Sequence, residues 1–154
     1  MEEKEYEYSF KVKSINPFIA YCKENDYEFI KETEQIRTLY KNENKTNARI
    51  TIEKKDGVIS KVLDFKDDVM SDEILIVRRE TQQLNFENEE AVLSILNFLE
   101  YKKNTVLNRK RYVYKKDNVK FEIDDYSSPE VAYVVAIEGE KAEVDNVYNE
   151  VKDY

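Results

Sequence analysis

Charged side chains alternate with apolar ones along several stretches of this 154-residue chain, and the first such stretch begins at Glu5. In an extended strand, one face of residues 5–12 would carry four polar side chains, Glu5, Glu7, Ser9 and Lys11. Two carboxylates placed two residues apart on a strand can share one divalent cation, as Glu5 and Glu7 would. Taken alone, the stretch is more typical of an edge strand with a solvated face.

Later stretches repeat this scheme, so the charged phases of several strands are predicted to face one polar interior. The basic members of that interior are Lys11, Arg49, Lys66, Arg78, Arg109 and Arg111, and the acidic members are Glu5, Glu7, Glu80, Glu122, Asp124 and Glu138. Burying so many charges is costly unless each one is compensated. The charges can pair in a network of salt bridges. Alternatively, the bases can hold a triphosphate while the acids hold Mg²⁺ or Mn²⁺. A third reading is an interaction protein whose charges are solvated.

Composition excludes several kinds of site. The chain has no histidine, which rules out histidine general bases and histidine-ligated metals. Cys22 is its only cysteine, so an internal disulfide and a thiolate zinc site are excluded. The net charge of −8 argues against nucleic-acid binding driven by bulk charge. No apolar run is long enough to span a membrane, and we expect a cytoplasmic protein.

The order of elements predicts a single α+β domain over residues 1–154. Strands are expected at about 4–13, 29–41, 48–55, 58–66, 73–82, 105–116, 119–126 and 131–139. Helices are expected after Asn16-Pro17, after Asn88 and near the C-terminus. The second helix carries a stripe that includes Val92, Ile95 and Leu96. Eight antiparallel strands are enough to close a barrel, with about three helices flanking its apolar outer face.

The ordered set of charged motifs resembles the CYTH superfamily, also called triphosphate tunnel metalloenzymes, over nearly the whole chain. Glu5-x-Glu7 resembles the start of the family's Glu-x-Glu-x-Lys signature, and residues 35–40 resemble its second strand. The other motifs that carry the resemblance are Arg49-Ile50-Thr51, Asp64-Phe65-Lys66, Arg78-x-Glu80-x-Gln82, Arg109-Lys110-Arg111, Ile123-Asp124 and Ala136-Ile137-Glu138.

The resemblance implies an eight-stranded antiparallel triphosphate tunnel and assigns roles to its residues. The catalytic and substrate-binding bases would be Arg49, Lys66, Arg78, Arg109 and Arg111, with Lys11 as a further substrate-binding residue. The ligands of Mg²⁺ or Mn²⁺ would be Glu5, Glu7, Glu80, Asp124 and Glu138. The implied partner is a triphosphate-containing small molecule, and class IV cyclases suggest a homodimer by analogy.

The family includes triphosphatases and class IV adenylate cyclases, and a hydrolase acting on thiamine triphosphate, inorganic triphosphate or a nucleoside triphosphate is favoured here. A cyclase that converts ATP to cyclic AMP and pyrophosphate is the alternative, as is a non-catalytic module that binds nucleotide or polyphosphate. The chain departs from the family pattern at Ser9, Thr51, Gln82 and Ala136, where the family has charged residues.

Overall fold

The computed structural model describes residues 3–72 and 74–154, without the side chains of residues 3–4, 68–72 and 78–80. Its strands are β1 (Glu3–Val12), β2 (Glu28–Lys41), β3 (Ala48–Lys55), β4 (Val58–Asp72), β5 (Leu75–Glu80), β6 (Leu84–Asn85), β7 (Lys102–Lys116), β8 (Val119–Ser128) and β9 (Ala132–Gly139). Its helices are α1 (Asn16–Glu24), α2 (Glu89–Phe98) and α3 (Lys141–Val151). None of the helices in the described part of the chain is long and apolar enough to cross a bilayer.

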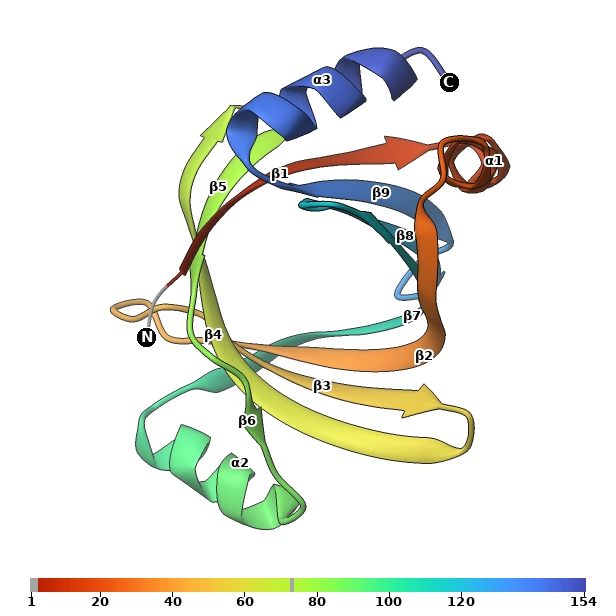
Figure 1. Cartoon of the computed structure of the whole chain (residues 1–154). Coiled ribbons are helices and arrows are strands. Elements are labelled where there is room, and N and C mark those ends of the chain that lie inside the picture. The colour runs from red at the N-terminus through yellow and green to blue at the C-terminus, as the bar shows by residue number, and fades with distance from the viewer. Residues whose placement is uncertain (1–2, 73) are drawn as a thin grey trace.

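The strands form one antiparallel sheet whose hydrogen-bonded order is β3-β2-β7-β8-β9-β1-β5-β4-β6. Because β3 also pairs with β4, eight of the strands surround a common interior (Figure 1). The two halves of β4 pair with different strands and so close the barrel: residues 58–65 pair with β3, and residues 66–72 pair with β5. The predicted eight-stranded antiparallel barrel is confirmed, and β6 adds a two-residue strand beside β4.

The region between the predicted strands 58–66 and 73–82 differs from expectation. Residues 67–72 were expected to form a polar connection, but the structure continues β4 through them to Asp72. Their acidic residues have low intrinsic strand propensity, so pairing with β5 overrides the local preference. The following strand, β5, ends at Glu80, and Gln82 therefore does not continue it.

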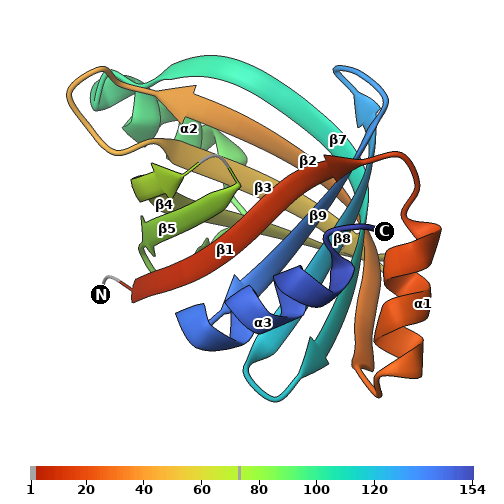
Figure 2. The same cartoon turned by 90° about the horizontal axis from the view of Figure 1, so that it is seen from above.

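Helices α1 and α3 cover the outer apolar face of β1, β8 and β9. The core between them contains Phe18, Cys22, Phe121, Ile123, Val135, Ile137, Val144 and Val151. Figure 2 shows α3 lying along β1 and β9. The ring of Tyr8 on β1 stacks on Tyr148 of α3 at 4.2 Å, and its hydroxyl donates to Asp145 Oδ1 at 2.6 Å. The apolar phase of β1 is thus committed to the outer core, which leaves Glu5 and Glu7 on the inner face.

Helix α2 covers a second, smaller core on the opposite side of the barrel (Figure 1). Asn88 Oδ1 caps this helix by accepting a hydrogen bond from the Ala91 N–H at 3.0 Å, as predicted. Val92 and Leu96 pack into a cluster with Ala48, Ile50, Leu63 and Tyr101. Ile95 is 57% exposed, so the packed face of α2 is narrower than the sequence stripe.

Gly139 ends β9 in a conformation that a larger residue should not tolerate. Its φ is +154°, and an added Cβ would lie 2.5 Å from the carbonyl oxygen of Asn118. We expect Gly139→Ala to lower the free energy of unfolding by about 2–4 kcal/mol, since strain and a backbone clash add. Gly57→Ala is the control: its φ is +79° but nothing lies within 4 Å of the added Cβ, so about 1 kcal/mol is expected. Urea denaturation measures both, and equal losses would contradict the role of the Asn118 contact.

Candidate functional site

The inner faces of the strands line a cavity of about 350 Å³ in which most side chains are charged. Its acidic lining residues include Glu5, Glu7, Glu122, Asp124 and Glu138. Its basic lining residues include Arg37, Arg49, Lys66, Arg109, Arg111 and Lys120. The arginines come from the neighbouring strands β3, β2 and β7, whereas Glu5, Glu7 and Glu138 come from β1 and β9 on the opposite wall (Figure 1).

Glu5, Glu7 and Glu138 form an acidic cluster where β1 lies beside β9. Glu7 and Glu138 are direct cross-strand partners, and one carboxylate oxygen from each of the three residues lies within 4.8 Å of the others. Burial raises the pKa of Glu138 above its ordinary value, and the charges of Glu122 and Glu5 raise it further. A cation would offset this repulsion. Because Mg²⁺ and Mn²⁺ prefer carboxylate oxygens, the cluster fits a hard divalent ion.

Two lysines approach the acidic cluster. Lys66 Nζ on β4 donates to Glu5 Oε1 at 3.1 Å, and Lys120 Nζ on β8 lies 3.1 Å from Glu138 Oε2. Burial alone would lower the pKa of Lys120, but Glu122 and Glu138 raise it above its ordinary value. Lys120 is therefore cationic, and both lysines lie beside the acidic cluster, where an anion bound next to the cluster could reach them.

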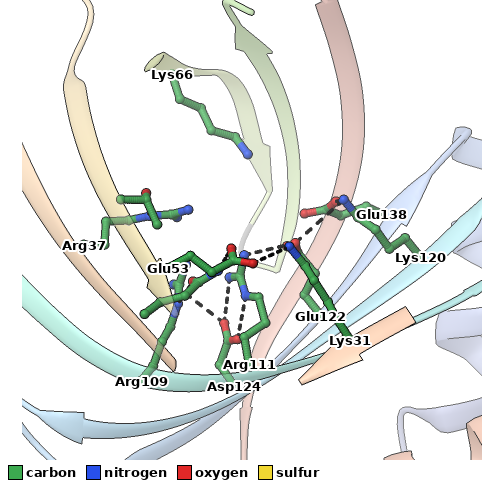
Figure 3. A network of polar contacts seen from close by, with 12 residues as sticks. Lys31, Arg37, Glu53, Lys66, Arg109, Arg111, Lys120, Glu122, Asp124 and Glu138 are labelled. Atoms are coloured by element: carbon green, nitrogen blue, oxygen red, sulfur yellow. Dashed lines mark hydrogen bonds and ion pairs between the residues drawn. The ribbon is translucent and has the colours of Figure 1, made fainter. Parts of the chain in front are cut away.

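Arg111 on β7 is held by a bidentate ion pair with Asp124 on β8. Its Nε donates to Asp124 Oδ1 at 2.8 Å and its Nη2 to Oδ2 at 2.9 Å, while Nη1 donates to Glu122 Oε2 at 3.0 Å (Figure 3). Arg111 and Asp124 are 9% and 2% exposed. Burial alone would lower the pKa of Arg111, but Glu122 and Asp124 raise it. This guanidinium is thus fixed in place and permanently charged.

Arg109 is also buried, but it has donor capacity left over. Its Nε donates to Gln35 Oε1 and its Nη1 to the Tyr126 hydroxyl, each at 2.8 Å. Its Nη2 is buried without a hydrogen-bond partner among the described residues. Unsatisfied buried donors of a charged group are costly, so an acceptor bound in the cavity would be favoured here.

The two remaining arginines of this wall lie on β2 and β3. Arg49 Nε donates to Asp64 Oδ1 at 2.7 Å and Nη2 to Oδ2 at 2.9 Å. Arg37 Nε donates to the Thr51 hydroxyl at 2.9 Å. Burial lowers the pKa of Arg37 well below its ordinary value, and the charges of Arg49, Arg109 and Arg111 lower it further. Arg37, Arg49, Arg109 and Arg111 are called the arginine wall below.

No protein-family model matches the sequence, and no curated protein is similar to it in sequence. Solved structures with the same fold are nevertheless numerous. The PH1012 protein of Pyrococcus horikoshii is 16% identical with a TM-score of 0.75, over 94% of this chain and 88% of that one. The HpAC1 protein of Hippeastrum, a proposed adenylyl cyclase with a dominant triphosphatase activity, is 13% identical with a TM-score of 0.65, over 95% and 84%. The chain shares the fold of these solved structures, which include proteins described as adenylate cyclases.

This fold does not by itself determine an activity. A chain in the Schizosaccharomyces pombe Mediator head module matches with a TM-score of 0.71 at 7% identity, over 100% of this chain and 96% of that one. The same fold is therefore found in a chain of the Mediator head module and in a protein with a dominant triphosphatase activity. The function of this chain has to be argued from its own cavity.

Most of the predicted CYTH site residues meet in the cavity. Those that line it are Glu5, Glu7, Arg49, Lys66, Arg109, Arg111, Asp124 and Glu138. Asp124 was predicted to be a metal ligand, but the structure places both of its oxygens on Arg111, away from the acidic cluster. The side chains of Arg78 and Glu80 lie outside the described residues, although their backbones pair with Glu5 and Lys66.

Lys11 is not in the cavity, contrary to the prediction that it faces the interior. Its side chain is 75% exposed and lies 4.0 Å from Glu130. Lys11 has the inward phase of β1, but it pairs with Val134 near the end of the strand, where a long side chain can extend into solvent. Strand phase alone could not distinguish these two outcomes.

Two departures from the CYTH pattern meet across the sheet. Ser9 and Ala136 are direct cross-strand partners, and both line the cavity beside the acidic cluster. This part of the wall lacks the charged side chains that the family pattern would place there. Gln82 is exposed beyond the end of β5, and Gln83 lines the cavity.

Three charged residues of the cavity had no predicted role, although Glu122 was predicted to face the interior. Lys120 and Glu122 shared the charged phase of β8 but were not assigned a role, and they contact Glu138 and Arg111. Arg37 is in phase with Gln35 on β2, which also faces inward. All three could have been found from the sequence, because each occupies the inward-facing set of alternating positions on its strand.

Proposed function

We propose that this chain binds a triphosphate-containing small molecule in its cavity and hydrolyses it with the help of Mg²⁺ or Mn²⁺. The observation that supports this most directly is the opposition of the acidic cluster and the arginine wall across one cavity. A polyphosphate needs several cationic donors along its length, and its metal needs carboxylates at one end. The cavity provides both, with the buried Nη2 of Arg109 lacking an acceptor.

The residues that line the cavity would have different roles according to their position in it. Arg49, Arg109 and Arg111 would hold phosphate oxygens, with Arg111 fixed by Asp124 and Arg109 fixed by Gln35. Lys66 would bridge between the phosphates and Glu5. Glu5, Glu7 and Glu138 would hold the cation, which polarises the phosphate and orients water when bound. Hydrolysis adds water across the terminal phosphoanhydride bond and releases orthophosphate and diphosphate.

A binding module without turnover is the second candidate, and one observation favours it. Ser9 and Ala136 leave the wall next to the acidic cluster without charge. Loss of charge there would weaken stabilisation of the transition state more than binding of the whole polyanion, because the arginine wall is intact.

The deciding experiment incubates the purified chain with tripolyphosphate, thiamine triphosphate and ATP, with Mg²⁺ or Mn²⁺ and with EDTA. Orthophosphate, pyrophosphate and cyclic AMP are measured, and binding is followed by calorimetry. Orthophosphate release that EDTA abolishes supports the hydrolase. Binding without product supports the module, and cyclic AMP with pyrophosphate supports a cyclase. If no triphosphate binds in the presence of metal, the charges form a structural salt-bridge network and the proposal fails.

A further inference from the structure

Arg37 is the member of the arginine wall whose charge is least compensated within the protein. Among the described residues it takes part in no ion pair, and its side chain donates one hydrogen bond, from Nε to the Thr51 hydroxyl. That bond leaves the Nη nitrogens directed toward the cavity, and Figure 3 shows the side chain extending into the space below Lys66. By contrast, Arg111 and Arg49 each have a bidentate carboxylate.

The position of Arg37 joins the other arginines into a continuous row. On β2 it is the cross-strand partner of Thr51 on β3 and of Leu107 on β7. Arg49 and Arg109 each lie two residues from those partners, so both are diagonal neighbours of Arg37 on the inner face. Without Arg37, the cationic groups of β3 and β7 would be separated by the full width of β2.

A half-buried guanidinium beside three like charges is unfavourable unless an anion is present at least part of the time. Burial and the charges of Arg49, Arg109 and Arg111 all lower the pKa of Arg37, and Glu122 offsets them by less. Such a local cost is typical of a binding site whose missing counter-charge is the ligand.

Resting on the proposed function, we propose that Arg37 contacts the phosphate oxygens of the bound triphosphate, as a guanidinium supplied from β2 at the level of Thr51. Thr51 is the position where the family pattern has the second arginine of its strand. In this chain Thr51 instead accepts a hydrogen bond from Arg37 and so orients it. The guanidinium therefore comes from β2 instead of β3, but it enters the same part of the cavity.

The test measures tripolyphosphate affinity by calorimetry in Mg²⁺ for wild type, Arg37→Gln, Arg37→Lys and the exchange Arg37→Thr with Thr51→Arg. Arg37→Gln should weaken binding about 10- to 100-fold, as expected for loss of a charge-assisted contact. The exchange should restore affinity to within about threefold of wild type, because it returns a guanidinium to the neighbouring strand. Arg37→Lys should lie between the two, since an ammonium makes no bidentate contact. Lys41→Gln, an exposed change on the same strand, should leave affinity unchanged.

Thermal stability separates ligand contact from a structural role. Removing Arg37 relieves repulsion among the arginines, so without ligand the melting temperature of Arg37→Gln should equal or exceed that of wild type. Tripolyphosphate should raise the melting temperature of the variant by less than it raises that of wild type. Affinity of Arg37→Gln and Arg37→Lys within threefold of wild type would overturn the inference, as would a lowered melting temperature with an unchanged ligand shift. If wild type itself binds no tripolyphosphate, the proposed function fails first.

Discussion

Replacing Glu7 with Gln is expected to reduce metal-dependent hydrolysis of tripolyphosphate by about 100- to 1000-fold, equivalent to about 3–4 kcal/mol of transition-state stabilisation. Glu7 is 4% exposed and lies between Glu5 and Glu138 in the acidic cluster. The amide keeps the size of the side chain but removes the charge that a divalent cation requires.

The measurement is the initial rate of orthophosphate release as a function of Mn²⁺ and Mg²⁺ concentration. The half-saturating metal concentration should rise together with the fall in maximal rate, because the same carboxylate binds the ion and positions it. Glu28→Gln, an exposed change of the same type on β2, is the matched control and should leave both values unchanged. A wild-type rate for Glu7→Gln at saturating metal would show that the cation binds elsewhere.

Alternation along the strands carried most of the information about the fold. Tyr6, Tyr8 and Phe10 pack into the outer core while Glu5 and Glu7 line the cavity, as their phases predict. Local signals failed where tertiary pairing decided the conformation. The acidic stretch 67–72 is strand because β5 lies beside it, and the two-residue β6 is too short to leave a periodic signal.

The candidate site could be predicted as a set of residues but not as a set of contacts. Phase places Glu5 and Lys66 in one interior, yet their pairing across 61 residues of sequence depends on the strand order. Asp124 shows the same limit. Alternation along the strand predicts that its carboxylate faces inward, but only the register of β7 and β8 shows that it lies opposite Arg111. Arg37 was missed since its role depends on Thr51, which lies opposite it only in the folded sheet.

The register that joins Asp124 to Arg111 also makes Asp124→Asn the substitution with the largest expected effect on stability. Both oxygens of Asp124 accept hydrogen bonds from Arg111, and its Oδ2 lies 3.7 Å from Arg109 Nη1. The amide would leave two buried guanidiniums facing a neutral group, one end of which is itself a donor. We expect the free energy of unfolding to fall by about 3–5 kcal/mol, the range for breaking a buried ion pair from one side.

Urea denaturation of Asp124→Asn measures this loss, and Asp125→Asn, the adjacent and less buried residue of β8, should cost less than about 1 kcal/mol. Adding tripolyphosphate should return part of the lost stability to Asp124→Asn, because a bound polyanion supplies the counter-charge that the guanidiniums have lost. A loss below about 1 kcal/mol would mean that Glu122 alone compensates Arg111. In that case Asp124 would be available to a metal ion, as the sequence first predicted. The carboxylate of Asp124 thus decides whether the charge of Arg111 is compensated mainly by the protein itself or by a bound ligand.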